Sequence, residues 1–227
     1  MLGRRRGRQT RGAPLHVRTL APVIGAYLLA LGSLCTAVSV PLPASAAVGT
    51  LDHAVLAELN YARAHPDDYA RLLRRAAQRG EGGGRYASVT ETDPDAVDEA
   101  IDFLERQRPL PPLRPDPKLA ASARDHVIAQ GREGDVGHNE SSGVSFGQRL
   151  KRHGVWAGLS AEDISYGYDA PHDVVRQLII DSGVANRGHR KNIFDPTLTL
   201  AGVSCGRHSV YGAMCVIDFA GAMAPER

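Results

Sequence analysis

The sequence lacks most of the short motifs that usually reveal catalytic chemistry. It has no His-Glu-x-x-His zinc motif, no glycine-rich phosphate loop followed by Lys, and no paired Cys-x-x-Cys. A serine or cysteine hydrolase therefore has little local support. Any chemistry has to come from residues that the fold brings together.

Aromatic residues and cysteines are also scarce, at 5% and three residues of 227. So few cysteines exclude a small domain held together mainly by disulfides. The 43% hydrophobic and 23% charged residues exclude a disordered or collagen-like chain. The chain is long enough for one domain with a substantial core.

Acidic residues are missing from residues 1–46, which hold six arginines. An uncharged run, 20–40, follows the arginines and leads to the small-residue site Ala44-Ser45-Ala46. This order predicts a signal peptide over 1–46 and a secreted mature chain, 47–227. The alternative is a retained N-terminal membrane anchor, because 21 uncharged residues are enough to span a bilayer.

The charge of the mature chain differs in sign from that of the whole. Six of the 27 Lys and Arg residues lie in 1–46, which leaves 21 basic against 25 acidic residues, a net charge of −4. A nucleic-acid partner is therefore not expected. Of the three cysteines, Cys205 and Cys215 remain, and export favours a disulfide between them over two buried free thiols.

Hydrophobic periodicity places helices first and strands last. Helices are expected over 51–64, 67–78, 94–104, 117–130, 145–153 and 171–181, and strands over 161–166, 198–205 and 210–219 with a turn at 206–209. Asp116 and Asp169 are expected to cap the helices that follow them. The order predicts an α+β fold in layers.

Two histidines and two acids stand out in loops and at element ends: His138, Glu162, Asp181 and His189. Such a set can bind a divalent cation, zinc above all, or polarise a water. The spacing alone favours the alternative, in which each histidine caps a loop or satisfies a buried polar group. Of the other histidines in the mature chain, His126 is expected to be a partly buried packing residue. The surface is expected to hold His53, His65, His153, His172 and His208.

Several stretches of the mature chain resemble the CAP superfamily, the cysteine-rich secretory proteins, antigen 5 and pathogenesis-related proteins, in its bacterial secreted form. The matching stretches are Leu59-Asn60-Tyr61-Ala62-Arg63, Pro109-Leu110-Pro111-Pro112-Leu113, Leu119 to His126, Gly137-His138, Ala161 to Gly167, Ser182 to Ile193, Gly202-Val203 and Asp218-Phe219-Ala220. Together they cover about 51–221, with an insertion at about 65–108.

The resemblance implies a three-layer α–β–α sandwich with a cleft that carries two histidines and two acids. His138, Glu162 and His189 match the family's positions, and Asp181 stands where many members have Glu. Asp163 replaces the family's usual Asn, and a more negative cleft is expected from it.

Family likeness limits the function to three hypotheses. The first is a secreted binding module whose cleft holds a divalent cation and an extracellular or cell-envelope ligand. The second is a metal- or His-assisted hydrolase of peptidase type, which would use Glu162, His138 and His189. The third is a lipid or sterol carrier. The first is preferred, because the fold provides a site and not a reaction.

Overall fold

The structure, a computed structural model, describes residues 50–80 and 93–223. Its elements are α1 (Leu51–Ala64), α2 (Pro66–Gln78), α3 (Pro94–Arg106), β1 (Arg114–Pro115), α4 (Pro117–Glu133), α5 (Phe146–Arg152), β2 (Ser160–Tyr166), α6 (Pro171–Ile180), α7 (Gly188–Ile193), β3 (Leu200–His208) and β4 (Gly212–Ala220). The predicted signal peptide lies outside these residues. Within the described ranges, no helix has both the length and the apolar character that a membrane span needs.

A four-stranded sheet in the order β1-β3-β4-β2 forms the centre. β4 pairs antiparallel with both β3 and β2, and the short β1 pairs in parallel with Leu200 and Ala201 of β3 only. Among the described strands, β2 is therefore at one edge, and most of the outer edge of β3 has no partner.

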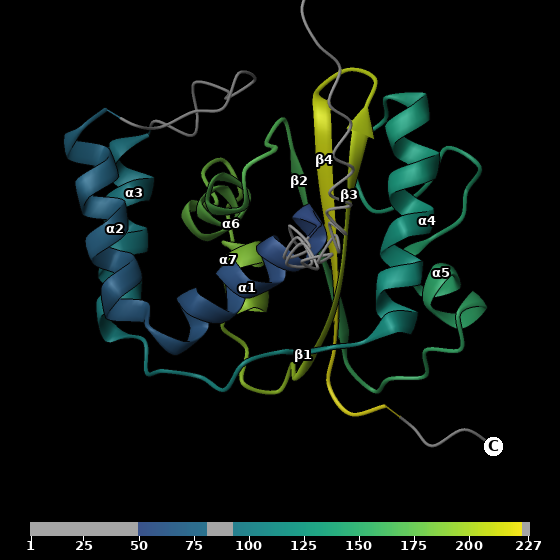
Figure 1. Ribbon diagram of the computed structural model, residues 1–227, viewed down its shortest axis with the longest axis horizontal. Coiled ribbons are helices and arrows are strands. Elements are labelled where there is room, and N and C mark those ends of the chain that lie inside the picture. Colours follow the sequence, from purple (N-terminus) through teal and green to yellow (C-terminus); the bar gives the residue numbers. More distant parts are fainter. Residues whose placement is uncertain (1–49, 81–92, 224–227) are drawn as a thin grey trace, which may run out of the picture. The chain divides into compact units, whose positions relative to one another are not determined.

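Helices cover both faces of this sheet (Figure 1). α4 packs on β3 and β4, and α5 packs on α4. On the other face α1 contacts β3, while α6 and α7 contact β2, and α2 and α3 lie beyond them. The predicted α+β arrangement of helical layers around a sheet is confirmed.

Three glycines let α4 lie unusually close to β3. A Cβ on Gly202 would overlap the backbone of Leu119 and Ala120, one on Gly206 would meet Val127, and one on Gly131 would overlap the carbonyl of Arg207. The two elements run in the same direction over a matching length, because 11 helical residues and five strand residues both rise ~16 Å.

The C-terminal hairpin carries the predicted disulfide. Cys205 and Cys215 are directly opposite each other in the β3–β4 register and are bonded, with their Cα atoms 4.1 Å apart. The pairing expected from export and cysteine number is therefore present in the structure.

Three local predictions are wrong. The hairpin turns at 209–211 instead of 206–209, because the ring of His208 accepts hydrogen bonds from the backbone N–H groups of Val210 and Tyr211. His208 is consequently buried and not a surface residue. Asp169 does not cap α6, whose N-cap residue is Ala170 without a side-chain bond.

The close contact of α4 and β3 gives a test by substitution. Gly202→Ala should lower the free energy of unfolding by about 3 kcal/mol, because backbone atoms cannot move away as a flexible side chain can. Gly147→Ala is the control, since a Cβ there meets nothing and a helical Gly→Ala change should stabilise by up to ~1 kcal/mol. Urea unfolding of both variants checks this, and equal stabilities would contradict the packing described.

Candidate functional site

The site lies along β2, the edge strand on the opposite side of the sheet from β1. Successive residues of a strand point to opposite faces, so Glu162 and Asp163 serve two different clusters. Glu162 contacts α5 and the loop between α4 and α5, whereas Asp163 accepts a hydrogen bond of 2.7 Å from Asn192 on α7. Both acidic side chains are buried.

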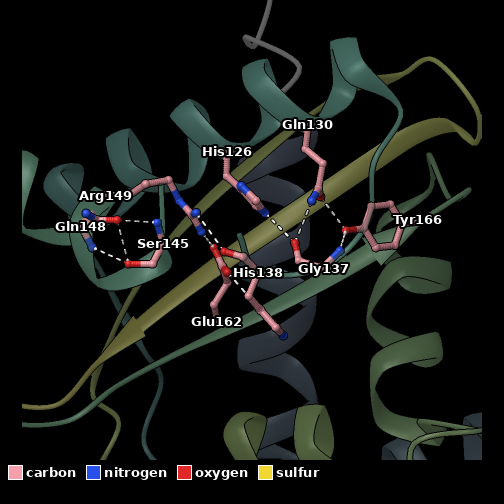
Figure 2. Close-up of polar contacts among 9 residues, drawn as sticks. All are labelled: His126, Gln130, Gly137, His138, Ser145, Gln148, Arg149, Glu162 and Tyr166. Atoms are coloured by element: carbon pink, nitrogen blue, oxygen red, sulfur yellow. Dashed lines mark hydrogen bonds and ion pairs between the residues drawn. The ribbon is translucent and has the colours of Figure 1, made fainter. Parts of the chain in front are cut away.

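Glu162 is held by two partners on its face of the sheet (Figure 2). Its Oε1 is 2.9 Å from Nδ1 of His138, and its Oε2 forms an ion pair with the guanidinium of Arg149. Arg149 also donates to the backbone carbonyl of His138 at 3.0 Å. Burial alone would raise the pKa of Glu162, but His138 and Arg149 outweigh it and lower the pKa.

A capping box positions Arg149. The Ser145 hydroxyl accepts from the backbone of Gln148, and the Gln148 side chain accepts from the backbone N–H of Ser145 at 2.8 Å. This reciprocal pair fixes the start of the short helix α5, which places Arg149 over the sheet.

The loop that carries His138 is fixed through the preceding glycine. The Gly137 carbonyl accepts from His126 at 2.9 Å and from Gln130 at 2.8 Å, and its N–H donates to the Tyr166 hydroxyl at 2.9 Å. Gly137 has a φ of 103°, which side-chain-bearing residues rarely adopt. Side chains from α4 and β2 thus hold the backbone of Gly137 and determine where His138 lies.

His189, like His138, contacts a buried carboxylate through Nδ1. Nδ1 of His189 is 2.7 Å from Oδ1 of Asp181, and the other carboxylate oxygen accepts from the His189 backbone N–H at 2.9 Å. Burial disfavours the charged ring, but the bond to Asp181 and the charge of Asp163 outweigh it and raise the pKa of His189.

Asp181 ends α6 in a left-handed conformation, with φ 54°. Asp tolerates this region better than most residues do. Arg187 donates to the Asp181 carbonyl at 2.7 Å, which joins the two ends of the connection between α6 and α7. Arg187 also binds Glu99, which attaches this connection to α3.

Asp163 links the two histidine–acid pairs electrostatically, because the charges of His189, Asp181 and His138 all act on it. Burial raises its pKa to about 7, against the opposing effects of His189 and Asn192. The increase in negative charge expected from this residue is therefore reduced below about pH 7, where Asp163 holds its proton for most of the time.

A further buried acid, Asp218, lies opposite Glu162 in the strand register. Burial and the neighbouring charge of Glu162 raise its pKa well above the usual range. It faces the Ser122 hydroxyl and Glu162 without forming a well-aligned hydrogen bond. Glu162 thus remains the charged member of this acid pair, with Arg149 as its counter-ion.

The four residues singled out from the sequence form two pairs, His138–Glu162 and His189–Asp181. Within 50–80 and 93–223, no three His, Cys, Asp or Glu side chains come together as a metal site. Each imidazole does have the carboxylate partner on Nδ1 that metal-binding histidines usually have. The arrangement does not supply the side-chain ligands of a closed zinc site. A cation at these four residues stays a prediction.

Hydrolysis with Glu162 as the base is not favoured by this geometry. Both of its oxygens are engaged, and its lowered pKa makes it a weak proton acceptor. The Gly-x-Ser-x-Gly pattern, which sequence reasoning overlooked, occurs at 143–147 and 202–206. Ser145 caps α5 and Ser204 lies inside β3, so neither sits on a strand-to-helix turn as a nucleophile would.

Sequence reasoning also missed the roles of Arg149 and Asp218. The capping-box pattern Ser-x-x-Gln at 145–148 was the available signal for the start of α5. No local pattern marks Arg149 as buried, because its partner lies on another element.

The chain belongs to the cysteine-rich secretory protein (CAP) family, whose profile matches residues 56–219. A comparison with curated protein sequences finds no match.

Solved bacterial structures are also similar to this chain. An extracellular protein with an SCP domain from Bacillus anthracis is 21% identical, with a TM-score of 0.44 over 58% of this chain and 42% of that protein. An outer surface protein from Borrelia burgdorferi is 18% identical, with a TM-score of 0.43 over 62% of this chain and 98% of that protein. This chain covers less than half of the Bacillus protein.

The protonation of Asp163 predicts a pH dependence of stability. Between ~3.9, the pKa in an unfolded chain, and about 7, the folded state holds the extra proton. The contribution of Asp163 to the free energy of unfolding therefore falls as pH rises, by up to ~1.4 kcal/mol per pH unit. Asp163→Asn, which keeps an acceptor for Asn192, should lose this slope.

Urea unfolding of wild type and Asp163→Asn at several values between pH 5 and 8 measures the difference. The variant should gain stability relative to wild type as pH rises, and the gain should level off above about pH 7. Two parallel stability curves would show that Asp163 is ionised throughout.

Proposed function

We propose that this protein is a binding module that acts outside the cell and contacts its ligand through the imidazoles of His138 and His189. One observation carries the proposal. Each ring uses Nδ1 for a buried carboxylate, and no described residue hydrogen-bonds to either Nε2 atom. A buried carboxylate orients each ring through Nδ1. The two Nε2 atoms are therefore available to a ligand that the described chain does not supply.

The exposure of the side chains agrees with this role. His138 is 54% exposed and His189 is 19% exposed, whereas Glu162 and Asp181 are at most 1% exposed. A ligand therefore meets the imidazoles and not the carboxylates. The signal-peptide pattern and the Cys205–Cys215 disulfide support a location outside the cell.

A divalent cation shared between the protein and the ligand suits these two donors. His138 and His189 would hold it through Nε2, with Glu162 and Asp181 as the groups that orient the rings. The cation would supply an attraction for an anionic or electron-donating group of the ligand.

Zinc titration by calorimetry tests this role. Removing one imidazole by His138→Ala or His189→Ala should weaken zinc binding by at least about tenfold. His172→Ala, at a ring that is 65% exposed outside the site, should leave zinc affinity unchanged. If the double variant at 138 and 189 binds zinc as tightly as wild type, or if wild type binds none, the cation part of the proposal is wrong.

Asp181→Asn tests whether Asp181 acts by orienting the ring of His189, because the change alters the hydrogen bond and leaves the size of the side chain nearly the same. The asparagine oxygen can still accept from the backbone N–H of His189, but its NH₂ group cannot accept from Nδ1–H. Zinc affinity should fall by about 10-fold to 100-fold while the melting temperature changes little.

The zinc affinity of the wild-type protein should also drop on acidification. The drop should begin above the ordinary histidine pKa of ~6.5, because the pKa of His189 is raised.

A further inference from the structure

A concave surface that contains none of the residues of the histidine pairs lies between α4 and β3. It encloses about 510 Å³, which is within the ~300–1,000 Å³ typical of ligand pockets. Its lining includes Arg124 and Arg132 from α4 and Arg207 from β3, and no acidic residue. We call this surface the arginine groove.

The three arginines are exposed, and within the described part of the chain none of them forms an ion pair with an acid. This is unusual in a mature chain with a net charge of −4. Three unpaired guanidinium groups around one hollow provide a field that favours an anionic occupant. Guanidinium also matches carboxylate in shape, because it can form two parallel hydrogen bonds to it.

An apolar strip separates the charges. Ile128 is 57% exposed and lies on α4 between Arg124 and Arg132, with Val127 beside it in the lining. A simple anion would leave Ile128 in water. An occupant with an apolar group between two acidic groups would cover the strip and pair both ends.

The adjoining edge of β3 is the one that faces away from β4. β1 pairs only with Leu200 and Ala201, and no other described strand pairs with the rest of this edge. The N–H of Cys205 on this edge already donates to a carboxylate, that of Asp52 at the start of α1, over 2.8 Å. An acidic side chain beside this strand therefore has a precedent within the molecule.

The spacing of the charges matches an extended peptide. Arg124 and Arg132 are separated by ~12 Å along the helix axis. In an extended chain, residues i, i+2 and i+4 point to the same side, and the outer two are ~13 Å apart.

We propose that the arginine groove binds an extended acidic peptide segment, with acidic residues four positions apart and an apolar residue midway between them. The two acidic side chains pair with the arginines at the two ends of the groove, and the apolar side chain covers Ile128. This surface is separate from the histidine pairs and does not depend on the function proposed for them.

Fluorescence anisotropy with a labelled Glu-Thr-Leu-Thr-Glu peptide, flanked by Gly and Ser, tests the proposal. Arg124→Gln, Arg132→Gln and Arg207→Gln together should weaken binding by at least about tenfold. Changing Arg71, Arg75 and Arg106 to Gln gives a charge-matched control, because these exposed arginines lie on α2 and α3. That control should bind like wild type, as should His138→Ala.

Changes in the peptide give a second test of the proposal. Replacing both Glu residues by Gln, or the central Leu by Ser, should weaken binding severalfold, and Ile128→Ser should match the effect of the Leu change. Equal binding by the two triple variants overturns the proposal. So does preferential binding of inorganic polyphosphate or of anionic phospholipid vesicles with no measurable peptide affinity, which would make the groove a site for phosphate groups. Circular dichroism of each variant is the control for an intact fold.

Discussion

The buried ion pair between Arg149 and Glu162 holds together the face of the molecule that carries His138. It joins the short helix α5 to the edge strand β2, and the same guanidinium fixes the backbone at His138. A seven-residue helix is too short to be stable on its own. Its position therefore depends on this pair and on the capping box at Ser145. Because both charged groups are fully buried, the loss of either leaves an uncompensated charge in the interior.

The charge balance around β2 explains why the site presents imidazoles instead of a cluster of negative charge. Asp163 and Asp218 are buried acids with raised pKa values, and Arg149 neutralises Glu162. Four buried acids, Glu162, Asp163, Asp181 and Asp218, would by their number suggest a strongly negative cation site. Three of them, Glu162, Asp163 and Asp218, carry little net charge into the site. The charge of Asp181 is opposed by His189 at 2.7 Å and by the buried guanidinium of Arg190. Orientation of the rings is then the main contribution of the carboxylates.

Local sequence signals were enough to predict much of the fold and part of the site. Helical periodicity, a proline or acid at helix starts and the alternation in the last strands gave the helices other than α7 and the two strands of the C-terminal hairpin. The export signal and the cysteine count gave the Cys205–Cys215 pairing. Family-like segments pointed to His138 and His189. The burial of Arg149, the protonation of Asp163 and the inward position of His208 were not predicted. Each depends on a partner from another element, and periodicity carries no information about such partners.

The central claim is that buried carboxylates hold the Nδ1 atoms of His138 and His189 and leave the Nε2 atoms for a ligand. Long-range proton–nitrogen NMR of histidine-labelled protein above pH 8 measures which ring nitrogen carries the proton. The account predicts the Nδ1–H form for both residues, since a carboxylate accepts from that atom. The Nε2–H form at either ring, as in an unconstrained histidine, would contradict it for that residue.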